Sequence, residues 1–431
     1  MTRNVRPLLS TVAALLFVAP APAARAQDAA VAPWITDTIQ SSTLHTPRVL
    51  FVALPTGYRA SIDSFPVLVL LDADDRPQFE AAVANANFLA SRSEIPGLII
   101  VGVANGNDRT HDMSPPATGG TANLSPTAGG ADAFENFIAG EVLPYIRGKY
   151  RARPLTVLAG HSLGGLFGLY VAATRKNPYQ GIIAMSPSLW WNDSTVAHQY
   201  ADEIARLTTG QRIFVTSGAY EPQIDVTARR FIARLDSLKP RGVSYATHRY
   251  TDDTHALTPQ PSLIAGLRFV FEPISIARLP LSSPLFSWDS ATFVHVVATS
   301  ETTYARGARA LGLPEMFPES LLNGYGHGIL EEMKQPKVAT WVFKQNVAHY
   351  PASAGAHDSY GDGLLAEGDT ASAIAQYEQA VKLWEAKHDP LAAMGRQKLK
   401  RLEPAVHGAG GTHEQQGRLG PDRRTHLARV G

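Results

Sequence analysis

The stretch Leu155–Val171, which reads LTVLAGHSLGGLFGLYV, predicts a strand, a sharp turn and a helix in direct succession. Residues 155–159 form a short apolar run typical of a buried strand, and apolar residues recur with helical spacing from Leu166 onward. Between them, Gly160–Gly164 has the pattern G-x-S-x-G, centred on Ser162. A strand that turns directly into a helix crowds the backbone at its central residue, so glycine is favoured on both sides. We therefore predict that Ser162 projects from the tip of a strand–turn–helix elbow.

Apolar strands alternate with helical segments along most of the chain. Strands are predicted around residues 49–55, 65–71, 97–103, 155–159, 181–185, 212–217 and 244–250. Helices are predicted around residues 79–89, 131–150, 196–207, 226–238 and 262–271. Residues 34–54 alternate in the manner of two antiparallel strands, and residues 113–130 have the composition of a long loop. This order predicts an α/β fold, with a mostly parallel central sheet, helices on both faces, and reactive groups at the carboxyl ends of the strands.

The chain is expected to comprise five segments. Residues 1–26 have the positive start, the apolar run and the small-residue ending of a signal peptide cut after Ala26, which predicts a periplasmic or secreted protein. The remaining segments are an α/β domain at 27–275, a linker and accessory segment at 276–340, a helical region at 341–405 and a disordered tail at 406–431. Within the helical region, DSYGDGLLAEGDTASAIAQYEQAVKLW resembles one tetratricopeptide helix pair, which must pack on neighbouring structure. The C-terminal helices are therefore a candidate surface for a protein partner.

The composition of the 431-residue chain excludes some kinds of site and disfavours some kinds of partner. The absence of cysteine excludes disulfides and thiolate metal sites, and a formal net charge of +1 does not favour nucleic-acid binding. No stretch beyond the signal peptide is long and apolar enough to predict a membrane-spanning helix. The common phosphate-, zinc- and calcium-binding motifs do not occur. These features predict neither a metal nor a cofactor.

A serine at such an elbow needs a base, usually histidine, and a carboxylate that orients the base. In enzymes built on this kind of sheet, the acid and then the histidine follow the serine along the chain. His255 follows the last predicted strand in a polar loop and is predicted to be the base. Glu221 and Asp225 both follow the strand at 212–217. Glu221 is the preferred acid because it is nearer the strand end, and Asp225 is the alternative.

Five further residues are candidates for holding a substrate. The backbone N–H groups of Leu163, directly after the elbow serine, and of Asp74, in the loop after an earlier strand, are predicted to stabilise an oxyanion. Arg109 is a candidate for binding a substrate anion, with an ion pair to a nearby aspartate as the alternative. Trp190 and Trp191 are candidates for lining an acyl or aromatic pocket, with core packing as the alternative.

Several stretches together resemble the esterase D-like branch of the α/β-hydrolases, which includes ferric-enterobactin-type siderophore esterases and some carbohydrate esterases. In chain order they are FPVLVLLDADD, LIIVGVANGNDRTHDMSPP, FENFIAGEVLPYIRGKYRARP, LAGHSLGGLFGLY, SPSLWWND, GAYE and DDTHALTP. The resemblance as a whole covers roughly Trp34 to Phe271. The resemblance implies an α/β-hydrolase fold and an ester-cleaving hydrolase with Ser162 as nucleophile and His255 as base. It supports Glu221 as the acid more weakly, because members vary there.

Together, these features predict a serine esterase that cleaves a small-molecule ester through an acyl-enzyme. Two alternatives stay open. One is a catalytically idle hydrolase scaffold that serves as a binding protein, and the other is a peptidase of the same fold. A complete serine, acid and histidine set in the expected chain order favours an enzyme over the idle scaffold.

Overall fold

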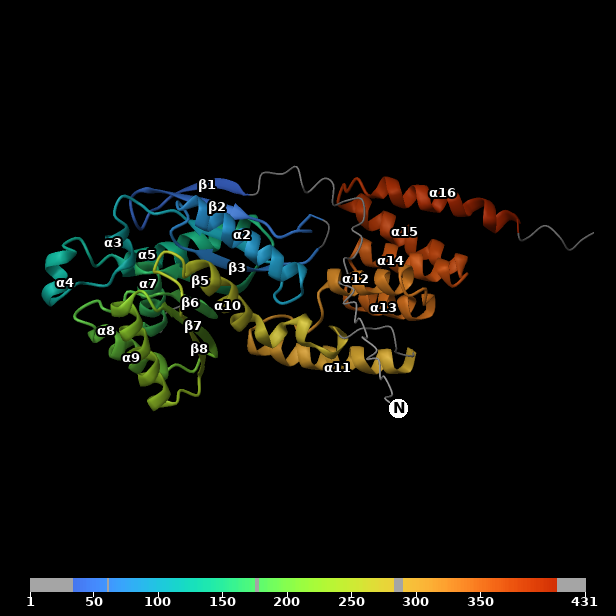
Figure 1. Cartoon of the computed structure of the whole chain (residues 1–431). Helices are drawn as coiled ribbons and strands as arrows, with labels where there is room; N and C mark the ends of the chain where they lie inside the picture. Colours follow the sequence, from blue (N-terminus) through green and yellow to red (C-terminus); the bar gives the residue numbers. More distant parts are fainter. Residues whose placement is uncertain (1–33, 60–61, 175–177, 283–289, 409–431) are drawn as a thin grey trace, which may run out of the picture. The chain divides into compact units, whose positions relative to one another are not determined.

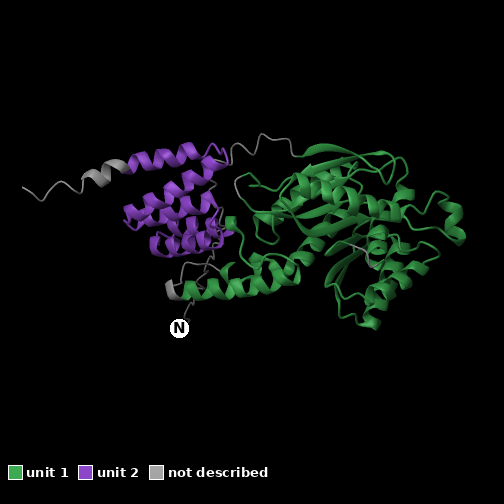
Figure 2. Cartoon of the chain, turned by 180° about the vertical axis from the view of Figure 1, so that it is seen from behind, with its two compact units in different colours: residues 1–320 green, residues 321–431 purple. Residues whose placement is uncertain are grey.

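The computed structural model describes residues 34–59, 62–174, 178–282 and 290–408. The chain divides into two compact units, residues 1–320 and residues 321–431 (Figure 2). The predicted signal peptide at 1–26 lies outside the described residues. Of the predicted disordered tail at 406–431, residues 406–408 are helical, and residues 409–431 lie outside the described residues.

The first unit is built on an eight-stranded sheet with the order β1-β2-β4-β3-β5-β6-β7-β8 (Figure 1). β2 pairs antiparallel with both β1 and β4, and every other pairing in the sheet is parallel. The strands are β1 (Ile35–Gln40), β2 (Pro47–Ala53), β3 (Phe65–Leu70), β4 (Ile99–Val103), β5 (Ala152–His161), β6 (Gly181–Met185), β7 (Gln211–Gly218) and β8 (Val243–Tyr250). The predicted α/β fold with an antiparallel pair at its start is confirmed.

Helices cover both faces of this sheet, as the alternation of strands and helices predicts. Successive side chains of a strand point to opposite faces. In β6, Ile182 faces Gly168 of α7, whereas Ile183 faces Gly266 of α10, so α7 and α10 lie on opposite sides. α8 packs on α7 and α9 packs on α8, while α2 packs on α10. The helices of this unit are α2 (Arg76–Ser91), α3 (Arg109–Met113), α4 (Gly119–Leu124), α5 (Ala131–Phe137), α6 (Leu143–Lys149), α7 (Leu163–Ala173), α8 (Thr195–Ala205), α9 (Pro222–Leu238), α10 (Pro259–Phe271) and α11 (Ser290–Ala310).

The structure adds three features to the predicted elements. α4 lies inside residues 113–130, where its sequence GGTANL gives no helical pattern. The helix predicted at 131–150 is interrupted by the π-helical turn η1 (Ile138–Val142) between α5 and α6. α11 lies within residues 276–340, which the sequence assigns to a linker and accessory segment. Its many β-branched residues are poor helix formers, so propensity alone does not reveal it.

The second unit is helical, and its helices are α12 (Glu319–Glu331), α13 (Pro336–His349), α14 (Ala354–Ala366), α15 (Thr370–Ala386) and α16 (Ala392–Gly408). It begins at residue 321, twenty residues before the predicted start of the helical region. α14 and α15 pack so closely that a Cβ on Gly361 would lie 2.6 Å from the ring of Tyr377. The Tyr377 hydroxyl donates to Asp362 at 2.6 Å, and Lys398 of α16 binds the same carboxylate at 2.7 Å. The tetratricopeptide-like character of this region stays a prediction.

None of the helices in the described parts of the chain is both long and apolar enough to cross a membrane.

Candidate active site

β5 and α7 meet at Ser162 without a connecting loop. β5 ends at His161 and α7 begins at Leu163, and Ser162 between them has φ 59° and ψ −113°. Such a backbone conformation costs a non-glycine residue on the order of 1–3 kcal/mol, and residues of this kind cluster at functional sites. A Cβ on Gly160 would lie 2.4 Å from the carbonyl oxygen of Gly164, so only glycine fits there. A Cβ on Gly164 would meet no atom of another residue closer than 3.4 Å, apart from the backbone of its own helix.

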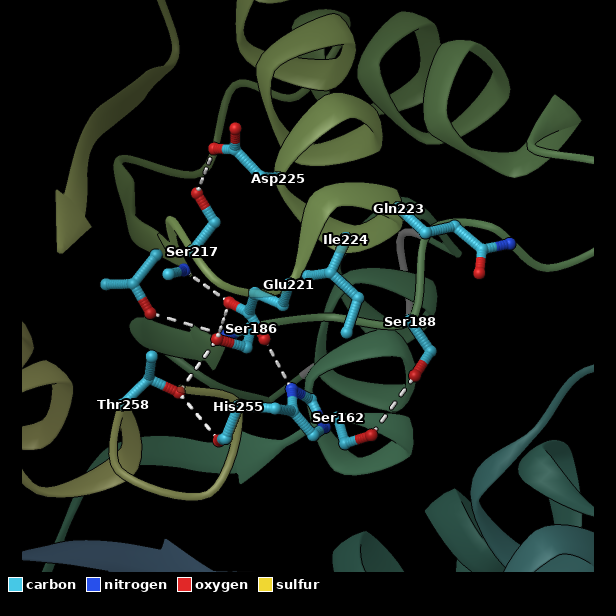
Figure 3. Close-up of polar contacts among 12 residues, drawn as sticks. Ser162, Ser186, Ser188, Ser217, Glu221, Gln223, Ile224, Asp225, His255 and Thr258 are labelled. Carbon is cyan, nitrogen blue, oxygen red and sulfur yellow. Dashed lines mark hydrogen bonds and ion pairs between the residues drawn. The ribbon is translucent and has the colours of Figure 1, made fainter. Parts of the chain in front are cut away.

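A hydrogen bond joins His255 to Glu221, which lie on different loops. Glu221 lies in the turn between β7 and α9, and His255 lies in the loop between β8 and α10. Nδ1 of His255 is 2.5 Å from Oε2 of Glu221 (Figure 3). Both loops leave the carboxyl ends of parallel strands, which is where reactive groups gather in this class of sheet.

The carboxylate of Glu221 is buried and contacts three donors. Its side chain is only 4% exposed, and its Oε1 accepts hydrogen bonds from Ser186 Oγ at 2.6 Å and from the backbone N–H of Gly218. Burial by itself raises the pKa of Glu221, but the hydrogen bonds from His255, Ser186 and Gly218 outweigh burial and lower the pKa below its ordinary value. The carboxylate is therefore ionised at neutral pH.

Asp225, the alternative acid, has other partners. It accepts a hydrogen bond from Ser217 Oγ at 2.9 Å and forms ion pairs with Arg229 at 3.2 Å and Arg249 at 3.0 Å. Figure 3 shows Asp225 on the far side of Ser217 from the imidazole of His255. Of the two candidate carboxylates, Glu221 is the one that the structure brings to His255.

The elbow serine lies beside this pair. The ring of His161, directly before Ser162, lies 4.3 Å from the ring of His255, measured between centroids. Figure 3 shows the His255 imidazole between Glu221 and Ser162. In this structure, the Ser162 hydroxyl is 3.2 Å from the hydroxyl of the buried Ser188.

His161 is a neutral neighbour of the candidate base. Burial, and secondarily the adjacent His255, lower the pKa of His161 to about 4. At pH 7, the His161 ring therefore packs against His255 without placing a positive charge beside it.

Arg109 forms an ion pair, which is the alternative that the sequence left open for it. Its Nε and one terminal nitrogen lie 2.5 and 2.8 Å from the two carboxylate oxygens of Asp72. The same terminal nitrogen donates to the backbone oxygen of His161 at 3.2 Å. Arg109 thus connects the loop after β3 to the strand that carries the elbow. Its side chain stays 32% exposed.

Two segments that were predicted to supply backbone N–H groups lie at or near the elbow. Leu163 is the first residue of α7, and an N–H group at that position has no acceptor within its own helix. On the β3 side, a carboxylate oxygen of Asp72 lies 3.5 Å from the point where a Cβ on Gly164 would be. Asp74, the residue predicted from the sequence, is exposed, and its carboxylate accepts the backbone N–H of Asn105 at 3.0 Å.

The two tryptophans differ in exposure. Trp191 has no exposed surface and belongs to the hydrophobic core, so the prediction that it lines a substrate pocket is wrong and the core-packing alternative holds. Trp190 packs against that core but stays partly exposed, and its ring centroid lies 5.7 Å from that of Trp191. Two adjacent tryptophans at a strand end give no sequence signal for which of them faces inward.

The sequence places Ser186 at the carboxyl end of a predicted strand, but it assigns no role to Ser186 or to Ser188. They occur in SPSLWWND, directly after β6, and both are buried. Isolated serines after a strand have no distinguishing pattern, and only the fold places one on Glu221 and the other on Ser162. Within the described residues, no group of three or more His, Cys, Asp or Glu side chains is arranged to hold a metal ion.

The chain matches the family model described as "Putative esterase" over residues 41–270, which is more than half of its length. The siderophore triacetylfusarinine C esterase of Aspergillus fumigatus is 38% identical over 93 residues, covering 21% of this chain and 30% of that protein. The siderophore enterobactin esterase of Emericella nidulans is 35% identical over 116 residues, covering 25% and 37%. The ferri-bacillibactin esterase BesA of Bacillus subtilis is 28% identical over 244 residues, covering 51% and 81%. The chain therefore spans about a third of the length of the first two relatives.

Solved structures share the fold at low sequence identity. An IroE-like serine hydrolase from Shewanella oneidensis has a TM-score of 0.62 and 22% identity, covering 74% of this chain and 99% of that one. The BES protein from Bacillus cereus has a TM-score of 0.50 and 24% identity, covering 56% and 97%.

Proposed function

Because this chain belongs to the esterase family, we propose that it is a serine hydrolase that cleaves small-molecule carboxylic esters through an acyl-enzyme. Ser162 is the nucleophile, His255 the general base and Glu221 the acid that orients it. The observation that carries this proposal is the 2.5 Å contact between His255 Nδ1 and the buried, ionised Glu221, beside a strained elbow serine.

The proposed reaction uses each of these groups in a distinct role. Glu221 accepts the Nδ1–H of His255 and so leaves Nε2 free to take a proton. Ser162 Oγ attacks the ester carbonyl while His255 Nε2 takes the hydroxyl proton, and a tetrahedral oxyanion forms. The intermediate collapses, His255 protonates the departing alcohol, and an acyl group stays on Ser162. Water, activated by His255, then attacks the acyl group and releases the acid.

Two backbone N–H groups are proposed to hold the oxyanion. One is that of Leu163 at the start of α7, where the helix dipole also favours negative charge. The other comes from the loop at residues 72–74, for which Asp74 was the prediction from the sequence. Arg109 supports this arrangement, since its contacts with Asp72 and with the His161 carbonyl connect the two sides of the hole.

The attack is proposed to begin with a rotation of the Ser162 side chain. In the structure its hydroxyl lies by Ser188 Oγ. For proton transfer, the hydroxyl must instead donate to His255 Nε2. A turn about the Cα–Cβ bond of a serine is fast compared with ordinary turnover, so this step does not limit the rate.

Siderophore esters are the substrate class to test first. Two relatives that match this chain at 35% identity or more are named siderophore esterases, and a third is named a ferri-bacillibactin esterase. Export to the periplasm or the medium is also proposed, on the signal-peptide pattern of residues 1–26. There, the enzyme would meet esters that arrive from outside the cell.

The test compares the wild-type chain with Ser162→Ala in hydrolysis of short p-nitrophenyl esters, followed by iron-loaded siderophore esters and by matched p-nitroanilides. The proposal predicts ester turnover that the substitution abolishes, with little turnover of the anilides. Faster anilide than ester cleavage would favour the peptidase. Equal background rates for both chains on every substrate would favour the idle binding scaffold.

A further inference from the structure

Ser186 is a buried serine with an unusual backbone. It is the first residue after β6, it has no exposed surface, and its φ is 44°. The left-handed region is uncommon for a residue with a side chain. Such a conformation is kept only where the surrounding structure holds the residue in place, and residues of this kind cluster at functional sites.

The hydroxyl of Ser186 connects two parts of the candidate site. It donates to Oε1 of Glu221 at 2.6 Å, and it lies 2.8 Å from Oγ1 of Thr258. Thr258 is also fully buried, and its Oγ1 lies 3.1 Å from the backbone oxygen of His255. The Ser186 hydroxyl donates its one proton to Glu221, so Thr258 must be the donor in the contact between Thr258 and Ser186. Thr258 therefore shares its hydroxyl proton between Ser186 Oγ and the His255 carbonyl oxygen. Figure 3 shows these four residues in contact.

We propose that Ser186 is a positioning residue for the triad, whose hydroxyl fixes the Glu221 carboxylate in the orientation that His255 requires. The inference rests on the proposed function of Ser162, His255 and Glu221. It adds a residue that contacts neither the substrate nor the nucleophile and that acts through Glu221.

The geometry explains why a second anchor on Glu221 is needed. A glutamate has three side-chain torsions, and the last one, which turns the carboxylate, has only a broad preference. Ser186 and the Gly218 N–H both bind Oε1, so the rotation of the carboxylate is fixed and Oε2 is directed at His255. Without the Ser186 hydroxyl, one short hydrogen bond to a charged acceptor is lost. The carboxylate can then turn away from Nδ1.

The first experiment measures kcat and KM for a p-nitrophenyl ester with Ser186→Ala and Ser186→Gly in the full chain. Loss of a hydrogen bond to a charged group predicts that kcat falls about 10- to 100-fold in both variants, with KM changed less than about twofold. Glycine adopts a φ of 44° without strain, so Ser186→Gly is expected to fold even where Ser186→Ala does not.

Two comparisons separate positioning from general packing. Ser186→Cys restores a weak donor at the same place and is expected to recover part of the lost kcat. Ser217→Ala is the matched control, because Ser217 is also a buried serine at a strand end and also donates to a buried carboxylate, that of Asp225. Its kcat should stay within about twofold of the wild type.

Thr258→Val gives an independent test, since it removes Oγ1 and keeps the shape of the side chain. If Thr258 acts through Ser186, the loss in Ser186→Gly/Thr258→Val is smaller than the product of the single losses.

A wild-type chain that hydrolyses the ester while Ser186→Gly keeps its full kcat would overturn the positioning role and leave the proposed function intact. A loss equal to that of Ser217→Ala would overturn it as well, because both losses would then reflect packing. A wild-type chain that turns over no ester contradicts the proposed function itself.

Discussion

The hydrogen-bond partners of two buried carboxylates distinguish Glu221, the proposed acid, from Asp225. Glu221 and Asp225 lie four positions apart and are both buried, but their hydrogen-bond partners differ in kind. Glu221 is bound by neutral donors and by His255, so its charge is directed to the imidazole. Asp225 is bound by two arginines, which neutralise it. Burial alone does not distinguish the two carboxylates, but their hydrogen-bond and ion-pair partners do.

We expect Glu221→Gln to lower kcat by about 10³- to 10⁴-fold, because the amide can donate to Nδ1 and hold the imidazole in the wrong tautomer. Asp225→Asn should keep kcat within about twofold, and each exposed arginine partner that it loses should cost at most about 1 kcal/mol of stability. Steady-state kinetics and thermal unfolding of both variants check this. The reverse ranking of the two kcat values would assign the acid to Asp225.

The position of Ser162 at the elbow and the pairing of His255 with Glu221 could be predicted, because chain order and strand ends restrict the choice to few residues. The same reasoning failed where no order rule applies. Trp191 and Trp190 are adjacent and chemically alike, and only the fold buries one of them completely. Ser186 was quoted in a matching stretch, but its contact with Glu221 depends on the pairing of β6 with β7, which no local pattern specifies.

Among the elements, the elbow depends on the close approach of β5 and α7. The motif G-x-S-x-G suggests that its two glycines have the same role, but the structure shows that they do not. Gly160 contacts the backbone of Gly164 so closely that no side chain fits, whereas Gly164 faces the side chains of Leu71 and Asp72 at ordinary distances.

Gly160→Ala should therefore lower the free energy of unfolding by more than about 2 kcal/mol and abolish ester hydrolysis, because a backbone clash cannot relax as a side-chain contact can. Gly164→Ala should change stability by less than about 1 kcal/mol, since alanine also favours the helix. Urea unfolding of both chains measures the difference. Equal destabilisation by the two substitutions would mean that the elbow is not limited by this contact.

The π-helical turn η1 holds the connection between β1 and β2. Glu141 in this turn accepts hydrogen bonds from Ser42 and from the backbone and hydroxyl of Thr43. Burial alone raises the pKa of Glu141, but these hydrogen bonds outweigh it and lower the pKa from 4.5 to about 2. Because the folded pKa is depressed, the stabilisation is complete above pH 4.5 and is lost as the pH falls toward 2.

Glu141→Gln should accordingly lower the melting temperature at pH 7 and have a much smaller effect at pH 2.5, where the wild-type chain has lost most of this stabilisation. Glu80→Gln, on the exposed side of α2, is the control. Melting curves of the three chains at both pH values test the sign. A larger effect at pH 2.5 than at pH 7 would contradict it.

Strand and helix positions were predictable where apolar periodicity is strong, as in β5, β6 and α9. The interruption of the 131–150 helix was not predictable, because residues 138–142 fit an α-helical pattern. The hydrogen bonds of Glu141 in the π-helical turn come from residues almost one hundred positions earlier, which no local pattern specifies. α4 was missed for the opposite reason, since its glycine-rich sequence has no periodicity.

The whole chain combines a unit that carries every proposed catalytic residue with a separate helical unit. The family match ends at residue 270, and the second unit begins at residue 321. Ser162, His255 and Glu221, with their hydrogen-bond partners, all belong to the first unit. The predicted boundaries could not anticipate α11 and α12, because their sequences have weak helical propensity or several glycines.

A chain that ends at Ser320 should therefore keep ester hydrolysis, with kcat within about threefold of the full chain. Its Ser162→Ala form is the control for background hydrolysis. A truncated chain that is soluble and folded but inactive would contradict this and show that the helical unit contributes to catalysis. A partner bound by α12–α16 would then be the next hypothesis to test.

A contact between another serine and another histidine provides an internal control for the proposal that Ser162 is the nucleophile. In the helical unit, His327 Nε2 lies 3.0 Å from Ser359 Oγ, and His327 Nδ1 lies 3.2 Å from Glu331. These are the contacts that the proposed mechanism requires of Ser162, His255 and Glu221, but Ser359 is buried within α14 and has no elbow geometry. It should not act as a nucleophile.

The most direct measurement is covalent labelling of the full chain with a fluorophosphonate, followed by mass spectrometry of the modified peptide. The account predicts one adduct per chain, on Ser162, that is absent in Ser162→Ala and unchanged in Ser359→Ala. An unlabelled wild-type chain, or an adduct on any serine other than Ser162, would contradict it.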